Sequence, residues 1–273
     1  MKRLSFILIL ASVLVTSCAN PVSAPQDKSA QTSITLSPSQ RTKVAKQIWK
    51  NESGGKVDGL TAWNVGEEFP SLGIGHFIWY PKGVEGPFTE SFPQFIRFAN
   101  ARGLRVPLVA QQADCPWTSR EQFFAQFNGA EMKGLRVWLS QNLTVQADFI
   151  IAKSQASLGR IIQDAPVSER SRIVENYRKV ASTTNGTYAL IDYVNFKGEG
   201  INPKERYNGM GWGLSQVLQG MRTTNGGQES AREFAESAKR ALDNRITNSP
   251  AARGEARWRA GWHKRCETYA APF

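Results

Sequence analysis

Residues 71–80 read Ser-Leu-Gly-Ile-Gly-His-Phe-Ile-Trp-Tyr, in a chain whose other patterns are mostly helical. β-Branched and aromatic side chains favour strands. The two glycines, Gly73 and Gly75, allow the backbone to bend or to approach another segment closely. We therefore expect an early β-hairpin at this point of the chain.

A helix is expected before the hairpin. Pro38, which stands between two serines, is typical of a helix start. Four apolar residues then recur at helical spacing: Val44, Ala45, Ile48 and Trp49. The run Asn-Glu-Ser-Gly-Gly at 51–55 indicates the end of this helix, because glycine is a common C-terminal stop.

Helical patterns dominate the remainder of the chain. The expected helices span 89–102, 119–141, 144–164, 168–181, 186–196, 210–221, 228–246 and 255–268. The 273 residues, of which 41% are apolar, are enough for a sizeable core. Residues 38–273 are therefore expected to form one α+β domain that is mostly α, with a small early β-hairpin lobe.

The first residues have the order of an export signal. Lys2 and Arg3 precede an apolar run from Leu4 to Val15, and Thr-Ser-Cys follows, ending at Cys18. A helix of this run would reach about 18 Å, which is too short to cross a bilayer. The four residues Val15-Thr16-Ser17-Cys18 resemble the lipobox of bacterial lipoproteins. This resemblance implies cleavage before Cys18 and lipidation of its thiol and amino group.

This resemblance divides the start of the chain into a signal peptide, 1–17, and a lipidated cysteine with a flexible polar tether, 18–37. Ala19 after the cysteine implies sorting to the outer membrane. We therefore expect a protein that faces the periplasm and touches the membrane through its lipid anchor only. Plain secretion with a chance cysteine is the alternative.

Composition limits the partners that we expect. The formal net charge is +11, and the part after the predicted signal peptide keeps +9, because Lys2 and Arg3 belong to that peptide; this excess suits an anionic polymer. Nucleic acid is not expected, because no Lys/Arg block or nucleic-acid motif is present. No metal or cofactor is expected either, because there are two histidines and no Cys-x-x-Cys pair. Cys115 and Cys266 could form a disulfide in an oxidising compartment, or remain two free buried thiols.

Glu52 is the candidate general acid. It follows Ile48 by four residues and Trp49 by three, which places it on the apolar face of its helix. Burial and the negative end of the helix would both raise the pKa of its carboxyl, as a general acid requires. From spacing alone, an exposed glutamate at a frayed helix end is the alternative.

The combination of Glu52 with Ser-Leu-Gly-Ile-Gly-His at 71–76 resembles the active-site signature of phage-type lysozymes. In that family a glutamate ends the first long helix, and a hairpin carries Thr-Ile-Gly-Ile-Gly-His. The resemblance covers about 30 of the 273 residues, and its separation of 24 residues from Glu52 to His76 is slightly longer than in the family. It implies a lysozyme-like domain in which Glu52 protonates the glycosidic oxygen, Ser71 holds the attacking water, and His76 ties the hairpin to the helix beside the substrate.

The second carboxylate departs from the family pattern. Asn64 falls near the position where phage-type enzymes carry an aspartate, and an amide cannot act as a base. Glu67 is our candidate for this role, and Glu68 is the alternative. A mechanism with one acid, as in lytic transglycosylases, needs neither residue.

Seven further residues are candidates for substrate binding: Trp79, Asp192, Asn195, Glu199, Tyr207, Trp212 and Gln216. Asp192, Asn195 and Glu199 share a helical face if their helix continues to 199. They would line a cleft or form a buried polar triplet. The aromatic residues would stack on sugar rings or pack in the core, and Gln216 stands in a glycine-rich stretch that also carries Trp212.

The sequence thus predicts a cell-wall glycoside hydrolase or lytic enzyme. It would cleave β-1,4 bonds of peptidoglycan or a similar amino-sugar polymer. The alternative is a non-catalytic lysozyme-like module that binds peptidoglycan or an envelope protein, and Asn64 favours that alternative.

Overall fold

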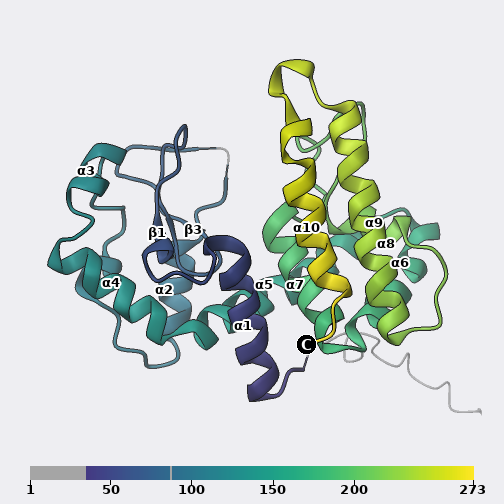
Figure 1. Cartoon of the computed structure of the whole chain (residues 1–273), viewed down its shortest axis with the longest axis horizontal. Coiled ribbons are helices and arrows are strands. Elements are labelled where there is room, and N and C mark those ends of the chain that lie inside the picture. Colours follow the sequence, from purple (N-terminus) through teal and green to yellow (C-terminus); the bar gives the residue numbers. More distant parts are fainter. Residues whose placement is uncertain (1–34, 87) are drawn as a thin grey trace, which may run out of the picture. The chain divides into compact units, whose positions relative to one another are not determined.

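The structure is a computed structural model that describes residues 35–86 and 88–273 (Figure 1). Cys18, the predicted signal peptide and most of the predicted tether lie outside these residues. The described residues all belong to one compact unit. Of the helices in this part of the chain, none combines the length and the apolar character needed to cross a bilayer.

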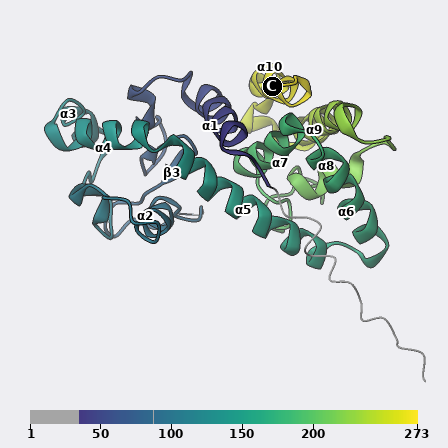
Figure 2. The same cartoon turned by 90° about the horizontal axis from the view of Figure 1, so that it is seen from below.

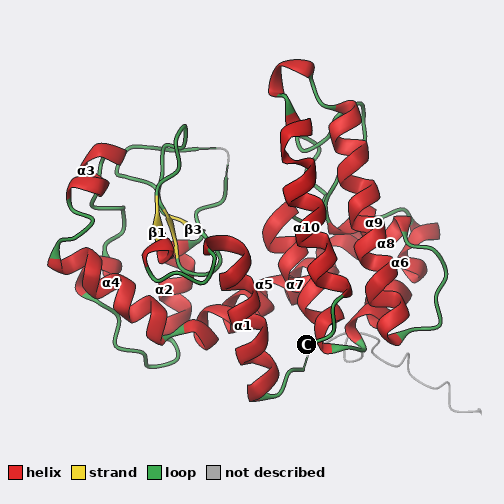
Figure 3. Cartoon of the chain, viewed as in Figure 1, coloured by secondary structure: helices red, strands yellow, loops and turns green. Residues whose placement is uncertain are grey.

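The α-helices are α1 (Pro38–Ser53), α2 (Phe92–Asn100), α3 (Arg120–Ala125), α4 (Ala130–Gln141), α5 (Leu143–Asp164), α6 (Val167–Ala181), α7 (Thr184–Lys197), α8 (Leu214–Gly220), α9 (Gly227–Asn248) and α10 (Arg259–Ala270). Short 3₁₀ helices cover Asp58–Leu60, Leu108–Gln111, Ala251–Arg253 and Glu255–Trp258. The strands are β1 (Thr61–Ala62), β2 (Ser71–Leu72) and β3 (Phe77–Ile78). The predicted α+β fold that is mostly α is confirmed (Figure 3).

The sheet is small and antiparallel, in the order β1-β2-β3. β2 and β3 form the predicted hairpin, in which Ser71 pairs with Ile78. β1 is a strand that sequence analysis did not predict. It pairs with β2, and Ala62 of β1 lies opposite Ser71 of β2. β1 left no signal because its two residues, Thr61 and Ala62, lack the run of β-branched and aromatic side chains that marks 71–80.

The start of α1 is fixed by a capping box. Ser37 Oγ accepts a hydrogen bond from the backbone N–H of Gln40, and Gln40 Oε1 accepts one from the backbone N–H of Ser37. These bonds satisfy backbone donors that a helix start leaves unpaired. Gly54 ends the helix in a left-handed conformation, with φ +65°. Glu52 therefore lies in the last turn of α1, as predicted.

The helical core is built around α7. Its residues 185–193 are all buried, and the helix packs against α5, α6, α9 and α10. α9 and α10 lie side by side (Figure 1). The long helix α5 packs against both α1 and α7, and Figure 2 shows its course from α4 toward α6. α7 and α10 are therefore held in a fixed relation to α1, which carries Glu52.

Three of the predicted helices differ from the structure. The helix expected at 119–141 is two helices, α3 and α4, separated by residues 126–129. The helix expected at 210–221 begins only at Leu214, because Asn208 and Gly209 form a tight turn with φ of +49° and +77°. The last helix is preceded by a 3₁₀ turn and begins at Arg259.

The disulfide considered between Cys115 and Cys266 is not formed. Both thiols are buried and free. Cys115 Sγ donates to the carbonyl oxygen of Trp117. Cys266 is one of the buried residues of α10. Burial raises the pKa of each thiol to about 12. The two cysteines therefore behave as small core residues in this fold.

Candidate active site around Glu52

The glycines of residues 71–76 serve close packing. Gly73 has φ +71°, and a Cβ there would stand 2.3 Å from Gln146 Oε1. A Cβ on Gly75 would stand 2.5 Å from the ring of Phe77. The backbone N–H of Ile74 donates to Gln146 Oε1 at 2.9 Å, which ties the turn to α5. Packing and this hydrogen bond therefore account for the two glycines of the turn.

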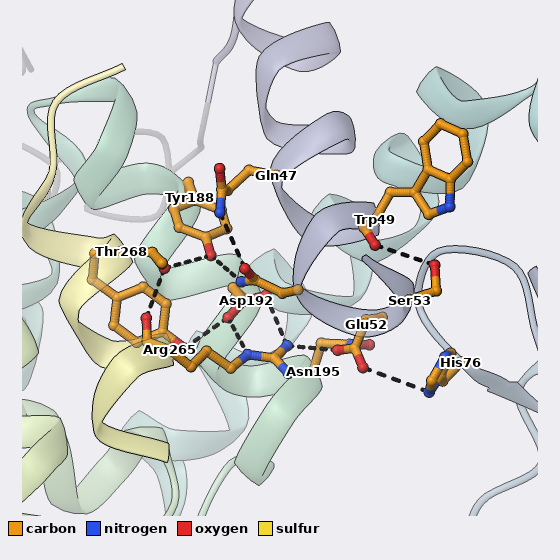
Figure 4. Close-up of polar contacts among 12 residues, drawn as sticks. Gln47, Trp49, Glu52, Ser53, His76, Tyr188, Asp192, Asn195, Arg265 and Thr268 are labelled. Carbon is orange, nitrogen blue, oxygen red and sulfur yellow. Dashed lines mark hydrogen bonds and ion pairs between the residues drawn. The ribbon is translucent and has the colours of Figure 1, made fainter. Parts of the chain in front are cut away.

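His76 ends this turn and points at the last turn of α1. It has an unusual backbone for a non-glycine residue, with φ +46°. Its Nδ1 lies 3.5 Å from Glu52 Oε2, as drawn in Figure 4. Its Nε2 is buried and has no hydrogen-bond partner among the described residues. The predicted contact between the hairpin and α1 through His76 is therefore present.

Glu52 is held from the opposite side by α7 and α10. Arg265 Nη2 donates to Glu52 Oε1 at 2.5 Å, and Asn195 Nδ2 donates to the same oxygen at 3.5 Å. The Glu52 side chain is 13% exposed. One carboxylate oxygen thus faces a guanidinium, and the other faces an imidazole (Figure 4).

The guanidinium of Arg265 is shared with a second, deeper carboxylate. Its Nε and Nη2 donate to Asp192 Oδ2 and Oδ1 at 2.8 and 2.9 Å. Tyr269 also donates to Asp192 Oδ2, at 2.7 Å. Burial alone would lower the pKa of Arg265, but Asp192 and Glu52 raise it well above its usual value. Arg265 is therefore a permanent cation beside Glu52.

The candidates for a second carboxylate lie elsewhere in the β lobe. Glu67 is half-buried, and its Oε2 accepts a hydrogen bond from Asn64 Nδ2 at 3.1 Å. Glu68 is exposed and borders a hollow of about 470 Å³ together with Glu85. Ser71 is buried within β2. In the part of the chain that the structure describes, neither Glu67 nor Glu68 contacts Glu52.

The predicted face of Asp192, Asn195 and Glu199 is correct only in part. Asn195 reaches Glu52, but Asp192 is fully buried in its ion pair and does not line a surface. Glu199 stands beyond the end of α7, because Gly198 breaks the helix with φ +77°. It accepts hydrogen bonds from Arg160 and Ser157 of α5 instead.

Trp79 belongs to the core and not to a cleft rim. It is fully buried and packs against Phe92 and Trp117. The substrate-binding interpretation of Trp79 is therefore wrong in this structure, because a sugar ring has no access to its faces.

Tyr207, Trp212 and Gln216 have structural contacts of their own. The hydroxyl of Tyr207 donates to Glu255 at 2.9 Å, and its ring packs on that of Trp212. Trp212 is 7% exposed, so the expectation that it stacks on sugars gives way to the packing alternative. Gln216 ties the backbone N–H of Gly213 to the carbonyl of Gly200. None of the three contacts Glu52 within the described residues.

Arg265 is the site residue that sequence analysis missed. The run His263-Lys264-Arg265 has the basic composition that is typical of a solvated helix edge. Arg265 instead points inward and joins two carboxylates that lie 213 and 73 positions away in sequence. A local pattern carries no information on partners at such separations, so only the structure could identify it.

No family model, curated protein or solved structure matches this chain. Within the described residues, no cluster of three or more His, Cys, Asp or Glu side chains could hold a metal ion. A functional assignment therefore depends on the contacts of Glu52 and on the signature around it.

Proposed function

We propose that this chain is a lysozyme-like glycosidase that cleaves β-1,4 bonds of peptidoglycan or a similar amino-sugar polymer, with Glu52 as the general acid. One observation carries the proposal. His76, the last residue of the glycine-rich signature, lies 3.5 Å from Glu52, although 24 positions separate the two residues. The two halves of the signature are therefore parts of one site.

The contacts of Glu52 suit a general acid, which becomes a carboxylate anion when it has transferred its proton. Arg265 binds Oε1, so a proton carried by Glu52 would sit on Oε2, the oxygen on the side of His76. Transfer of that proton to a glycosidic oxygen leaves a carboxylate. Arg265 would stabilise this carboxylate without moving, because it is already in place.

The second half of the reaction is assigned to the β lobe. In this proposal Glu67 acts as the base or as the carboxylate that stabilises the developing positive charge, and Ser71 orients the water. Glu68 is the alternative to Glu67. A lytic transglycosylase would need only Glu52, since the substrate's own hydroxyl then replaces the water.

The proposed location in the cell agrees with the proposed substrate. A lipid anchor on Cys18 in the outer membrane would hold the domain at the periplasmic face, next to the cell wall. The excess of positive charge would draw the protein to an anionic glycan.

A non-catalytic module is the second candidate, and a specific observation favours it. Oε1 of Glu52 is engaged by Arg265, and the position near which a catalytic aspartate is expected holds Asn64. In this alternative the site binds glycan strands or an envelope protein and breaks no bond.

The proposal is tested with purified peptidoglycan sacculi and full-length protein in a non-ionic detergent, followed by mass spectrometry of the released products. Muropeptides with a free reducing end indicate a hydrolase, and Glu67→Gln should then abolish release. Products lighter by one water indicate a transglycosylase, for which Glu67→Gln should be active. Glu121→Gln, an exposed change on α3, is the matched control. Binding to sacculi without any released product would support the non-catalytic alternative.

A further inference from the structure

A hollow of about 510 Å³ lies between α1 and α10. Its lining includes Lys50, Asn51, Phe196, Trp262, Lys264 and Arg265. Pockets of this size are typical of sites for small molecules. We call it the α1–α10 pocket.

The lining of the α1–α10 pocket includes Arg265 but neither Glu52 nor a residue of the hairpin. In Figure 4, Gln47 and Thr268, which both line the pocket, lie to one side of the Glu52–Arg265 pair, and His76 lies to the other. The pocket therefore borders the Glu52–Arg265 pair without including Glu52.

The charges of the pocket are one-sided. Its lining holds three cations, Lys50, Lys264 and Arg265, and no carboxylate. Arg265 is balanced by Asp192 and Glu52. Lys50 and Lys264 are exposed, and neither side chain forms an ion pair or a hydrogen bond within residues 35–86 and 88–273. Two positive charges therefore face the hollow without a partner.

Aromatic rings form one wall of the pocket, and further cations stand against them. Lys197 Nζ lies 4.0 Å from the ring centre of Phe196 and 3.7 Å from that of Trp262. Burial, together with Arg245 and Arg265, lowers the pKa of Lys197 to about 7. Burial is the largest cause of this shift, and the two arginines add a positive field beside the rings, which attracts an anion.

We propose that the α1–α10 pocket binds a small ligand that carries an oxyanion, a carboxylate or a phosphate, on a sugar-sized body. Lys50 and Lys264 supply the charge, and the ring of Trp262 supplies an apolar platform for the body. The two oxyanions share this chemistry, since a lysine recognises either one as a point charge. The site requires no bond cleavage at Glu52, so it stands independently of the glycosidase proposal.

Isothermal titration of the full-length protein in a non-ionic detergent tests this inference with three probes. N-acetylmuramic acid carries a carboxylate, N-acetylglucosamine is its neutral counterpart, and glycerol phosphate carries a phosphate. We expect at least one anionic probe to bind about tenfold more tightly than N-acetylglucosamine. Tighter binding of N-acetylmuramic acid identifies a carboxylate ligand, and tighter binding of glycerol phosphate identifies a phosphate ligand.

Variants locate the binding site. The double variant Lys50→Gln/Lys264→Gln should weaken the anionic probe by about tenfold or more, and Trp262→Leu should weaken it as well. Lys46→Gln, an exposed change of the same kind on α1 outside the lining, should leave the affinity unchanged. Glu52→Gln should also retain binding of the probe, because Glu52 does not line the pocket. The inference is overturned if no anionic probe exceeds N-acetylglucosamine, or if the double variant binds as the wild type does.

Discussion

Arg265 Nη2 lies 2.5 Å from Glu52 Oε1, although the two residues are 213 positions apart. The same guanidinium also binds Asp192, which is fully buried on α7. One arginine of the last helix thus joins the candidate catalytic carboxylate on the first helix to the core of the domain. Both the stability of the fold and the position of Glu52 depend on this residue.

Removal of the charge of Arg265 should destabilise the fold strongly. Arg265→Met leaves Asp192 buried without a cation, and the loss of one partner of a buried ion pair costs about 3–5 kcal/mol. We expect this decrease in the free energy of unfolding, measured by urea denaturation. Lys264→Met, an exposed change on the same helix, is the control and should cost less than about 0.5 kcal/mol.

A double variant distinguishes loss of charge from loss of packing. Arg265→Met/Asp192→Asn removes both charges, so it should be more stable than Arg265→Met alone. Equal or lower stability of the double variant would mean that the Asp192–Arg265 ion pair is not the cause of the effect.

Glu255 should make stability depend on acid. Burial tends to raise the pKa of its carboxyl, but hydrogen bonds from Arg245, Arg253 and Tyr207 outweigh burial and hold this pKa at about 2. The stabilisation is complete above the ordinary glutamate pKa of about 4.3 and is lost as the pH falls toward 2. The free energy of unfolding should therefore drop between about pH 5 and pH 2.

The variant Glu255→Gln should be less stable than the wild type at pH 7 and should show a smaller acid dependence over the same range. Glu85→Gln, an exposed substitution, is the control and should keep the slope of the wild type. Urea denaturation at several pH values measures all three proteins. An identical slope for Glu255→Gln and the wild type would contradict the assignment.

Lys197 should make the stability of the fold depend on pH in the neutral to basic range. Because its pKa in the fold is about 7 and the ordinary value is about 10.4, the unfolded chain binds more protons between these values. Stability due to this residue therefore rises with pH from about 7 to about 10. Lys197→Met should be more stable than the wild type at pH 6, and this advantage should shrink by pH 10. A difference that stays constant with pH would show that Lys197 titrates normally.

The two cysteines of the domain should resist modification. Each has a pKa of about 12 and is buried, so the reactive thiolate is scarce at pH 8. Peptide mapping after treatment with iodoacetamide should find Cys115 and Cys266 unmodified in native protein and modified in urea. A peptide that links Cys115 to Cys266 in an unreduced digest would contradict the structure.

Local sequence patterns predicted the elements that depend on local interactions. The start of α1, the hairpin at 71–80 and the place of Glu52 at a helix end follow from capping, glycine and periodicity, all of which act over a few residues. The contact between Glu52 and His76 was expected because a resemblance supplied it. It did not follow from periodicity.

Interactions between distant parts of the chain could not be predicted in this way. The sequence left Asp192 either at a cleft surface or in a buried polar group, and its burial depends on Arg265 and Tyr269 from α10. The sequence around Trp79 is the same whether the ring packs in the core or lies at a cleft rim. Only the residues that surround it in the fold decide between these two positions. Glu199 would share the helical face only if the helix continued to 199, but Gly198, with φ +77°, follows the last residue of α7, Lys197.

The central claim is that Glu52 is the acid that breaks a cell-wall glycan. The most direct test compares the rates at which wild type and Glu52→Gln release soluble muropeptides from sacculi, with both proteins shown to be folded by circular dichroism. The account predicts that Glu52→Gln binds sacculi but releases products about 10²–10⁴-fold more slowly, since it lacks the proton to transfer. Release by Glu52→Gln at the rate of the wild type would contradict it.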